Sequence, residues 1–115
     1  MKIYGIYQNG KCIAERVRMA DTFLSRFLGL MPEKTLEDGE GMILKNCPSI
    51  HCFFMKFTID VIYLDEAFSV IAKETVRPWR VGGIYRGARH VIELKEGMKA
   101  AFETGKQVEI KEKRI

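Results

Sequence analysis

The sequence contains no apolar run that approaches the roughly 20 residues of a transmembrane helix. Its first eight residues also lack the apolar core and the small-residue cleavage site of a secretion signal. These two absences predict a cytoplasmic protein that makes no membrane contact. Internal repeats, linkers and low-complexity tracts are absent as well, so the 115 residues predict a single domain, 1–115, with a real apolar core.

Cysteine and excess charge are both scarce. The three cysteines cannot all pair within one chain, and their spacing without a pattern is typical of a reduced cytosolic protein. The 19 basic and 15 acidic residues leave a net charge of +4. That excess favours an anionic partner slightly over a cationic one, but it does not by itself indicate nucleic acid.

Short apolar segments separated by turn residues are abundant. Asn9 and Gly10 both tolerate positive φ, so the segments on either side of them predict a first β-hairpin. Further strands are expected at residues 42–44, 68–76, 88–94 and 107–110, with a helical turn at 99–103 and a charged tail at 111–115. Many short strands predict a mainly β protein, a small barrel or sandwich.

One N-terminal helix is expected within residues 20–32, packed on the strands. Asp21 or Thr22 can cap it, and Pro32 prevents its continuation. Arg26 falls at the border of the apolar face, where its stem can pack while its head reaches outward. The apolar residues that share this face at helical spacing are Phe23, Leu24, Phe27, Leu28, Leu30 and Met31.

Residues 50–65 form the longest apolar stretch, and they contain charges that need an explanation. Aromatic and β-branched residues predict two strands buried on both faces, separated by a kink at 56–59. Lys56 and Asp60 interrupt this stretch. Because burying an isolated charge is costly, these residues must be paired, functional or at a strand end. The stretch is therefore the first place to look for a site.

Several spaced blocks of the sequence, taken together, match a known pattern. They are Arg26 with Gly29-Leu30-Met31, Gly41-Met42, Phe54-Met55-Lys56 with Thr58 and Ile59-Asp60, and Val91-Ile92-Glu93-Leu94 with Gly97. In these blocks the chain, from about residue 20 to 110, resembles domain-of-unknown-function family 192. The resemblance implies a compact, mainly β domain without an established biochemical role. Phe54 and Phe57 stand where many relatives have tryptophan and asparagine, respectively. A polar site that includes this asparagine in the relatives would lack it in this chain.

Charged residues within apolar segments lead to the main functional hypothesis. In a small barrel they could converge on a cavity that binds a small polar or anionic ligand, without a cofactor or metal. The residues expected to line this site are Arg26, Met55, Lys56, Asp60 and Glu93. Two alternatives stay open. One is an ion-pair network that orients the helix on the sheet, and the other is an enzyme that uses Asp60 or Glu93 as a general base.

Residues 77–90 combine arginines and aromatic residues without a single acid. They could cover the mouth of the cavity as a lid, or bind phosphates and stack on nucleic-acid bases. The candidate contacts are Arg77, Trp79, Arg80, Arg86 and Arg89. Because the net charge is small and no nucleic-acid-binding motif is present, polyanion binding is the alternative. The preferred interpretation is a solvated loop with Trp79 folded onto the core.

Soft metal ligands are present but poorly arranged. Cys47, His51, Cys52 and Met55 could suit copper(I) or zinc. On an extended strand, however, His51 and Cys52 point to opposite faces, and His51 and Met55 lie about 13 Å apart. We therefore expect cysteine and methionine to fill the core, with no metal bound. A cysteine nucleophile activated by His51 or His90 is not favoured either, since nothing in the sequence indicates contact or an electropositive setting.

Overall fold

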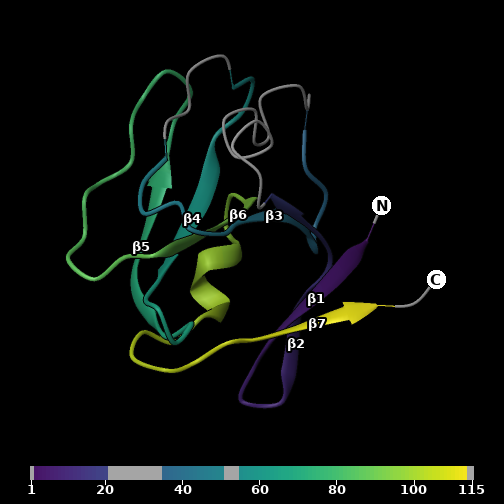
Figure 1. The fold of residues 1–115 in the computed structure, drawn as a ribbon. Helices are drawn as coiled ribbons and strands as arrows, with labels where there is room; N and C mark the ends of the chain where they lie inside the picture. The colour runs from purple at the N-terminus through teal and green to yellow at the C-terminus, as the bar shows by residue number, and fades with distance from the viewer. Residues whose placement is uncertain (1, 21–34, 51–54, 114–115) are drawn as a thin grey trace.

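The computed structural model of the chain describes residues 2–20, 35–50 and 55–113 (Figure 1). Seven strands form one sheet in the order β5-β4-β6-β3-β2-β1-β7. Neighbouring strands are antiparallel except for β2 and β3, which are parallel. The elements are β1 Ile3–Gln8, β2 Lys11–Ala20, β3 Glu40–Leu44, β4 Ile59–Leu64, β5 Val70–Val76, β6 His90–Lys95, the 3-10 helix η1 Met98–Ala101 and β7 Glu109–Lys113. The mainly β class is confirmed.

The predicted hairpin and the predicted helix have different outcomes. Asn9 and Gly10 adopt φ angles of 54° and 75° between β1 and β2, as a two-residue turn of this kind requires. The helix expected within residues 20–32 falls almost entirely outside the described residues. Within the described part of the chain the helical element is η1, close to the turn expected at 99–103. Strand β7 continues to Lys113, so residues expected in a solvated tail pair with β1 instead.

The two faces of the sheet bury different side chains. All six residues of β4 are buried, as the prediction of burial on both faces requires. Since successive side chains alternate, Ile59, Val61 and Tyr63 point to one face and Asp60 points to the other. Glu93 on β6 lies opposite Val61 and therefore shares its face. We call these the Glu93 face and the Asp60 face.

Each face has its own apolar cluster. The Glu93 face is packed by Ala20, Leu36, Met42, Leu44, Ile50, Met55, Ile59, Val61, Tyr63, Val76 and Val91. The Asp60 face is packed by Ile6, Ala14, Val17, Ile43, Ile62, Leu64, Val70, Ile92, Leu94, Phe102 and Val108. Asp60 and Glu93 therefore border two separate cores.

Backbone hydrogen bonds join the start of β5 to the segment before β7. The amide of Val70 donates to the carbonyl of Lys106 at 3.0 Å, and the amide of Gly105 donates to the carbonyl of Val70 at 2.7 Å. Phe68 accepts from the amide of Val108 at 2.9 Å. These bonds link the strand at one end of the sheet order to the approach to the strand at the other end.

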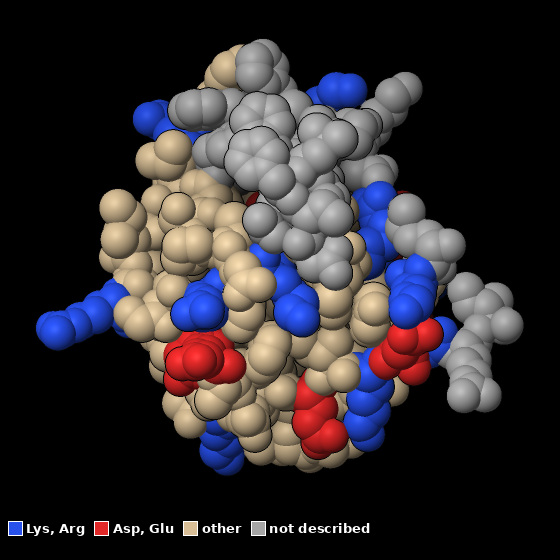
Figure 2. Space-filling model, in the orientation of Figure 1, with Lys and Arg blue, Asp and Glu red and all other residues tan. Residues whose placement is uncertain are grey.

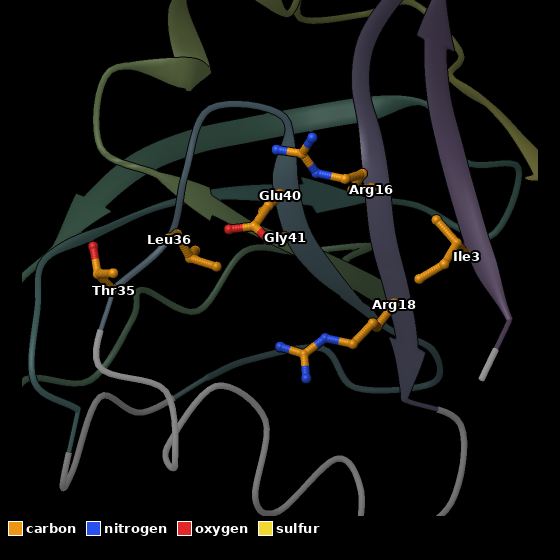
Figure 3. A pocket seen from close by; sticks show the side chains of 7 residues that line it. All are labelled: Ile3, Arg16, Arg18, Thr35, Leu36, Glu40 and Gly41. Carbon is orange, nitrogen blue, oxygen red and sulfur yellow. The ribbon is translucent and has the colours of Figure 1, made fainter.

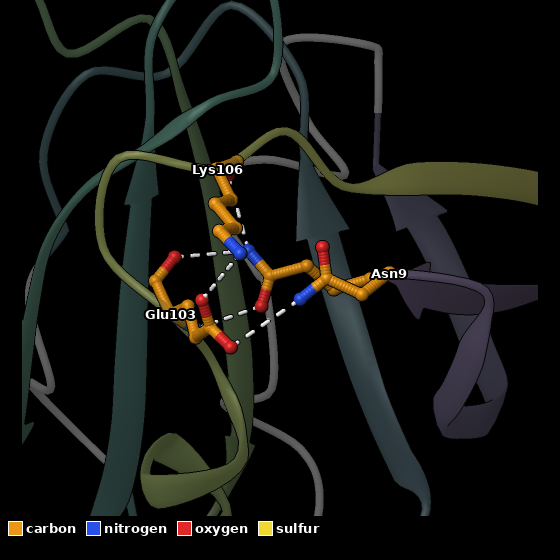
Figure 4. A network of polar contacts seen from close by, with 4 residues as sticks. Asn9, Glu103 and Lys106 are labelled. Atoms are coloured by element: carbon orange, nitrogen blue, oxygen red, sulfur yellow. Dashed lines mark hydrogen bonds and ion pairs between the residues drawn. The ribbon is translucent and has the colours of Figure 1, made fainter.

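Gln8 ties the β1–β2 hairpin to the same segment, next to the contact between Asn9 and Glu103 that Figure 4 shows. Its side chain is 4% exposed, and its Nε2 donates to the carbonyls of Glu103 and Lys106 at 2.9 and 3.1 Å. Its Oε1 accepts from the amide of Glu103 at 2.7 Å. A buried amide with these bonds stabilises the hairpin against the C-terminal part of the chain, while the exposed Glu103–Lys106 ion pair adds little.

Candidate functional site

Glu93 has the most unusual surroundings of any charged residue in the described part of the chain. Its side chain is 4% exposed, and its Oε1 has no hydrogen-bond partner there. Its cross-strand neighbours are Met42 on β3 and Val61 on β4, both apolar. Burial raises the pKa of this carboxyl to about 8. The protonated, neutral form is therefore favoured at neutral pH.

A pocket of about 290 Å³ opens beside β2 and β3 (Figure 3). Arg16 and Arg18 extend from β2 into it, because residues two apart on a strand share one face. Arg16 is exposed and Arg18 is half-buried. The Nη2 of Arg16 donates to the carbonyl of Asp38 at 3.3 Å. We call this the arginine pocket, and its lining consists of Ile3, Arg16, Arg18, Thr35, Leu36, Glu40 and Gly41.

The arginine pocket lies on the same face of the sheet as Glu93. The register pairs Arg18 with Met42, and Met42 in turn with Glu93. These three residues therefore form one row across β2, β3 and β6, with Arg18 and Glu93 about 10 Å apart at the backbone. The side chain of Met42 lies between the arginines and the buried acid.

Asp60 lies on the opposite face, where its buried carboxylate accepts hydrogen bonds from three groups. Its Oδ1 accepts from the Thr75 hydroxyl at 2.7 Å. Its Oδ2 accepts from the amides of Gly97 and Lys99, both at 2.9 Å. These amides are at the start of η1, so Asp60 fixes this 3-10 turn against the sheet. These hydrogen bonds explain why the carboxylate of Asp60 can be buried, and they give it a structural role.

The residues predicted to line one cavity are thus only partly brought together. Met55 is 6% exposed and packs in the cluster of the Glu93 face. Lys56 is exposed, and within the described residues no ion pair joins it to Asp60 or Glu93. Arg26 lies outside the described residues. Arg16 and Arg18 were not predicted, although the alternation of Arg16, Val17 and Arg18 in a strand was the signal that could have identified them.

The β5–β6 loop does not line the arginine pocket. Trp79 is 59% exposed, so the expectation that it folds onto the core is wrong. The loop contacts β5 through the amide of Gly83 and β4 through the ring of Tyr85, while most of the Trp79 side chain faces outward. A role for the loop as a lid over a cavity remains a prediction.

The thiol and histidine candidates form no metal site within residues 2–20, 35–50 and 55–113, where no group of three His, Cys, Asp or Glu side chains could hold an ion. Cys12 is exposed, and the thiol of Cys47 donates to the carbonyl of Ser49 at 3.1 Å. His51 and Cys52 lie outside the described residues. Over the same ranges, no helix has the length and apolarity needed to cross a membrane.

The sequence of the chain is similar to those of known proteins. A family model described as "Uncharacterized ACR" matches residues 6–110. A UPF0127 protein of Thermococcus sibiricus is 40% identical over 93 residues, which are 77% of this chain and 60% of that protein. A UPF0127 protein of Pyrococcus horikoshii is 42% identical over 93 residues, 75% of this chain and 81% of that protein. The chain thus spans less than two thirds of the T. sibiricus protein.

A solved structure shares the fold. The crystal structure of a protein of unknown function from Novosphingobium aromaticivorans superimposes with a TM-score of 0.80. The match covers 92% of this chain and 82% of that one, at 21% sequence identity. At this identity the similarity establishes the architecture alone.

Proposed function

The chain belongs to DUF192, a family of uncharacterised proteins, and from that premise we propose that it is a binding module for a small anionic ligand, held in the arginine pocket. The resemblance seen in the spaced sequence blocks is thereby confirmed, whereas the ligand is argued from this chain's own geometry. The observation on which the proposal rests is that Arg16 and Arg18 reach into one hollow from one face of β2.

The chemistry of two guanidinium groups supports an anion. A guanidinium presents five N–H donors in a planar fork that matches carboxylate and phosphate oxygens. The bond from Arg16 to the carbonyl of Asp38 uses one of them. Charge-assisted hydrogen bonds of this kind are about twice as strong as neutral ones. A carboxylate or phosphate group is therefore the natural occupant of the pocket.

The other walls of the pocket limit the ligand further. A volume of about 290 Å³ is near the lower end of ligand pockets, so the ligand is small. Leu36 and Ile3 provide apolar surface, and Glu40 places one carboxylate among the two arginines. The Oε1 of Glu40 accepts from the amide of Glu37 at 2.8 Å, which fixes this acid in place. Because Glu40 adds a negative charge beside the arginines, a monoanion with a short apolar portion is favoured over a dianion.

Titration calorimetry with butyrate, benzoate, inorganic phosphate and methylammonium tests this function. We expect binding of the monocarboxylates and none of the cation. The double variant Arg16→Gln/Arg18→Gln should lower the affinity at least tenfold, because each charge-assisted hydrogen bond contributes roughly 1.5–3 kcal/mol.

The matched control is Arg77→Gln/Arg80→Gln, which removes the same charge from the β5–β6 loop and should leave the affinity unchanged. If both double variants lost affinity for the anion equally, the loss would come from the change in net charge and not from the arginine pocket. Absence of binding by every anion tested would contradict the proposed function.

A further inference from the structure

The loop between β5 and β6, residues 77–89, exposes apolar side chains to an unusual degree. Trp79 is 59% exposed, Val81 63% and Ile84 93%, and these are the exposed large hydrophobic residues of the described chain. Four exposed arginines accompany them, namely Arg77, Arg80, Arg86 and Arg89. In Figure 2, the edge of the molecule where Figure 1 places this loop shows uncharged and basic surface without acidic side chains.

The centre of the loop is held by hydrogen bonds to Ile50 and to β5. The amide of Gly82 donates to the carbonyl of Ile50 at 2.9 Å, and the amide of Gly83 donates to Oε2 of Glu74 at 2.7 Å. A Cβ at Gly82 would lie 2.2 Å from the hydroxyl of Tyr63, so only glycine permits this approach.

An aromatic contact completes the anchor. The rings of Tyr85 and Tyr63 lie 4.5 Å apart between centroids, and the Tyr63 hydroxyl donates to Glu74 at 2.6 Å. Between and beside these anchor points the loop presents Trp79, Val81 and Ile84 outward. The apolar exposure therefore belongs to a loop held in place by backbone and side-chain contacts.

We propose that this loop docks the protein onto the surface of an anionic lipid bilayer. Aliphatic and tryptophan side chains enter the boundary between head groups and acyl chains, while arginines bind the lipid phosphates. Single-stranded nucleic acid fits less well, because base stacking uses aromatic side chains, whereas two of the three exposed apolar residues, Val81 and Ile84, are aliphatic. The proposal departs from the expectation of no membrane contact, which was based on the absence of a spanning segment. Peripheral docking requires no such segment.

Trp79 is the single tryptophan of the chain, so its fluorescence reports on the loop directly. With vesicles of phosphatidylcholine containing about one-third phosphatidylserine, we expect a blue shift of the emission and co-sedimentation of the protein. Pure phosphatidylcholine vesicles should give neither. Raising the salt to about 0.5 M should release the protein, because screening weakens the attraction between arginines and lipid.

Variants separate the apolar and the electrostatic contributions. Val81→Ser/Ile84→Ser should abolish the blue shift, whereas Arg77→Gln/Arg80→Gln should lower the partition coefficient by about fivefold for each arginine. The matched control, Lys11→Gln/Lys111→Gln, removes two exposed charges from β2 and β7 and should bind as the wild type does.

Three results would overturn the proposal. The first is an unchanged Trp79 emission with anionic vesicles. The second is an equal loss of binding in the lysine control, which would indicate attraction by net charge alone. The third is a response of Trp79 to a short single-stranded oligonucleotide but not to vesicles, which would assign the loop to nucleic acid.

Discussion

Replacing Glu93 by glutamine is expected to remove a steep decline in the free energy of unfolding between pH 4.5 and about 8. Burial raises the pKa of this carboxyl from 4.5 to about 8, so in this range the folded state holds a proton that the unfolded state has released. The folded state is therefore progressively destabilised as the pH rises, by up to about 1.4 kcal/mol per pH unit. Over the whole range the loss approaches about 5 kcal/mol.

Urea denaturation at a series of pH values measures this effect. In Glu93→Gln the free energy of unfolding should instead rise weakly with pH. The reason is that burial, Lys45 and Arg89 lower the pKa of His90. A lowered histidine pKa means that the unfolded state binds more protons, so this contribution rises with pH and opposes that of Glu93. The control Glu96→Gln removes an exposed carboxyl and should keep the wild-type slope. A wild-type stability that does not decline above pH 4.5 would show that Glu93 is ionised in the folded protein.

Asp60→Ala is expected to destabilise the protein by about 3–5 kcal/mol without weakening anion binding. The substitution removes the acceptor of the Thr75 hydroxyl and of the Gly97 and Lys99 amides, so three hydrogen bonds to a charged group are lost. Because Asp60 lies on the face opposite the arginine pocket, the folded fraction should bind anions as the wild type does.

Thr75→Val is the matched control for this prediction. It removes one of the three hydrogen bonds to Asp60 and should cost about 1–2 kcal/mol in urea denaturation. If Asp60→Ala kept its stability and lost anion binding, Asp60 would belong to a ligand site, and its assignment as a structural anchor would be wrong.

Local chemistry accounts for the part of the fold that could be predicted. Asn9 and Gly10 predict their turn because the positive φ angles are properties of those two residues. The nearly continuous apolarity of β4, interrupted by Asp60, predicts burial on both faces, and this prediction requires no knowledge of the neighbouring strands. Both predictions depend on residues close together in the sequence.

The candidate site could not be predicted in the same way, because it depends on strand register. Asp60 pairs with Leu94, and Val61 pairs with Glu93, so the two acids fall on opposite faces. A change of register by one residue would have placed them on the same face. Their similar surroundings in the sequence suggested a shared cavity, and long-range pairing decides otherwise.

The arginine pocket was missed for a related reason. Arg16 and Arg18 alternate with apolar residues on β2, a pattern that is usual for a strand with one solvated face. The hollow exists because residues 35–41 return beside β2 and start a parallel strand. No local pattern specifies where that segment packs.

The most direct test of anion binding is an NMR titration that follows the Nε–Hε signals of the arginine side chains while butyrate is added. We predict that the signals of Arg16 and Arg18 shift together and saturate, while those of Arg77 and Arg80 remain unchanged. Shifts that are equal for all arginines and do not saturate, or that are confined to the β5–β6 loop, would contradict a ligand site in the arginine pocket.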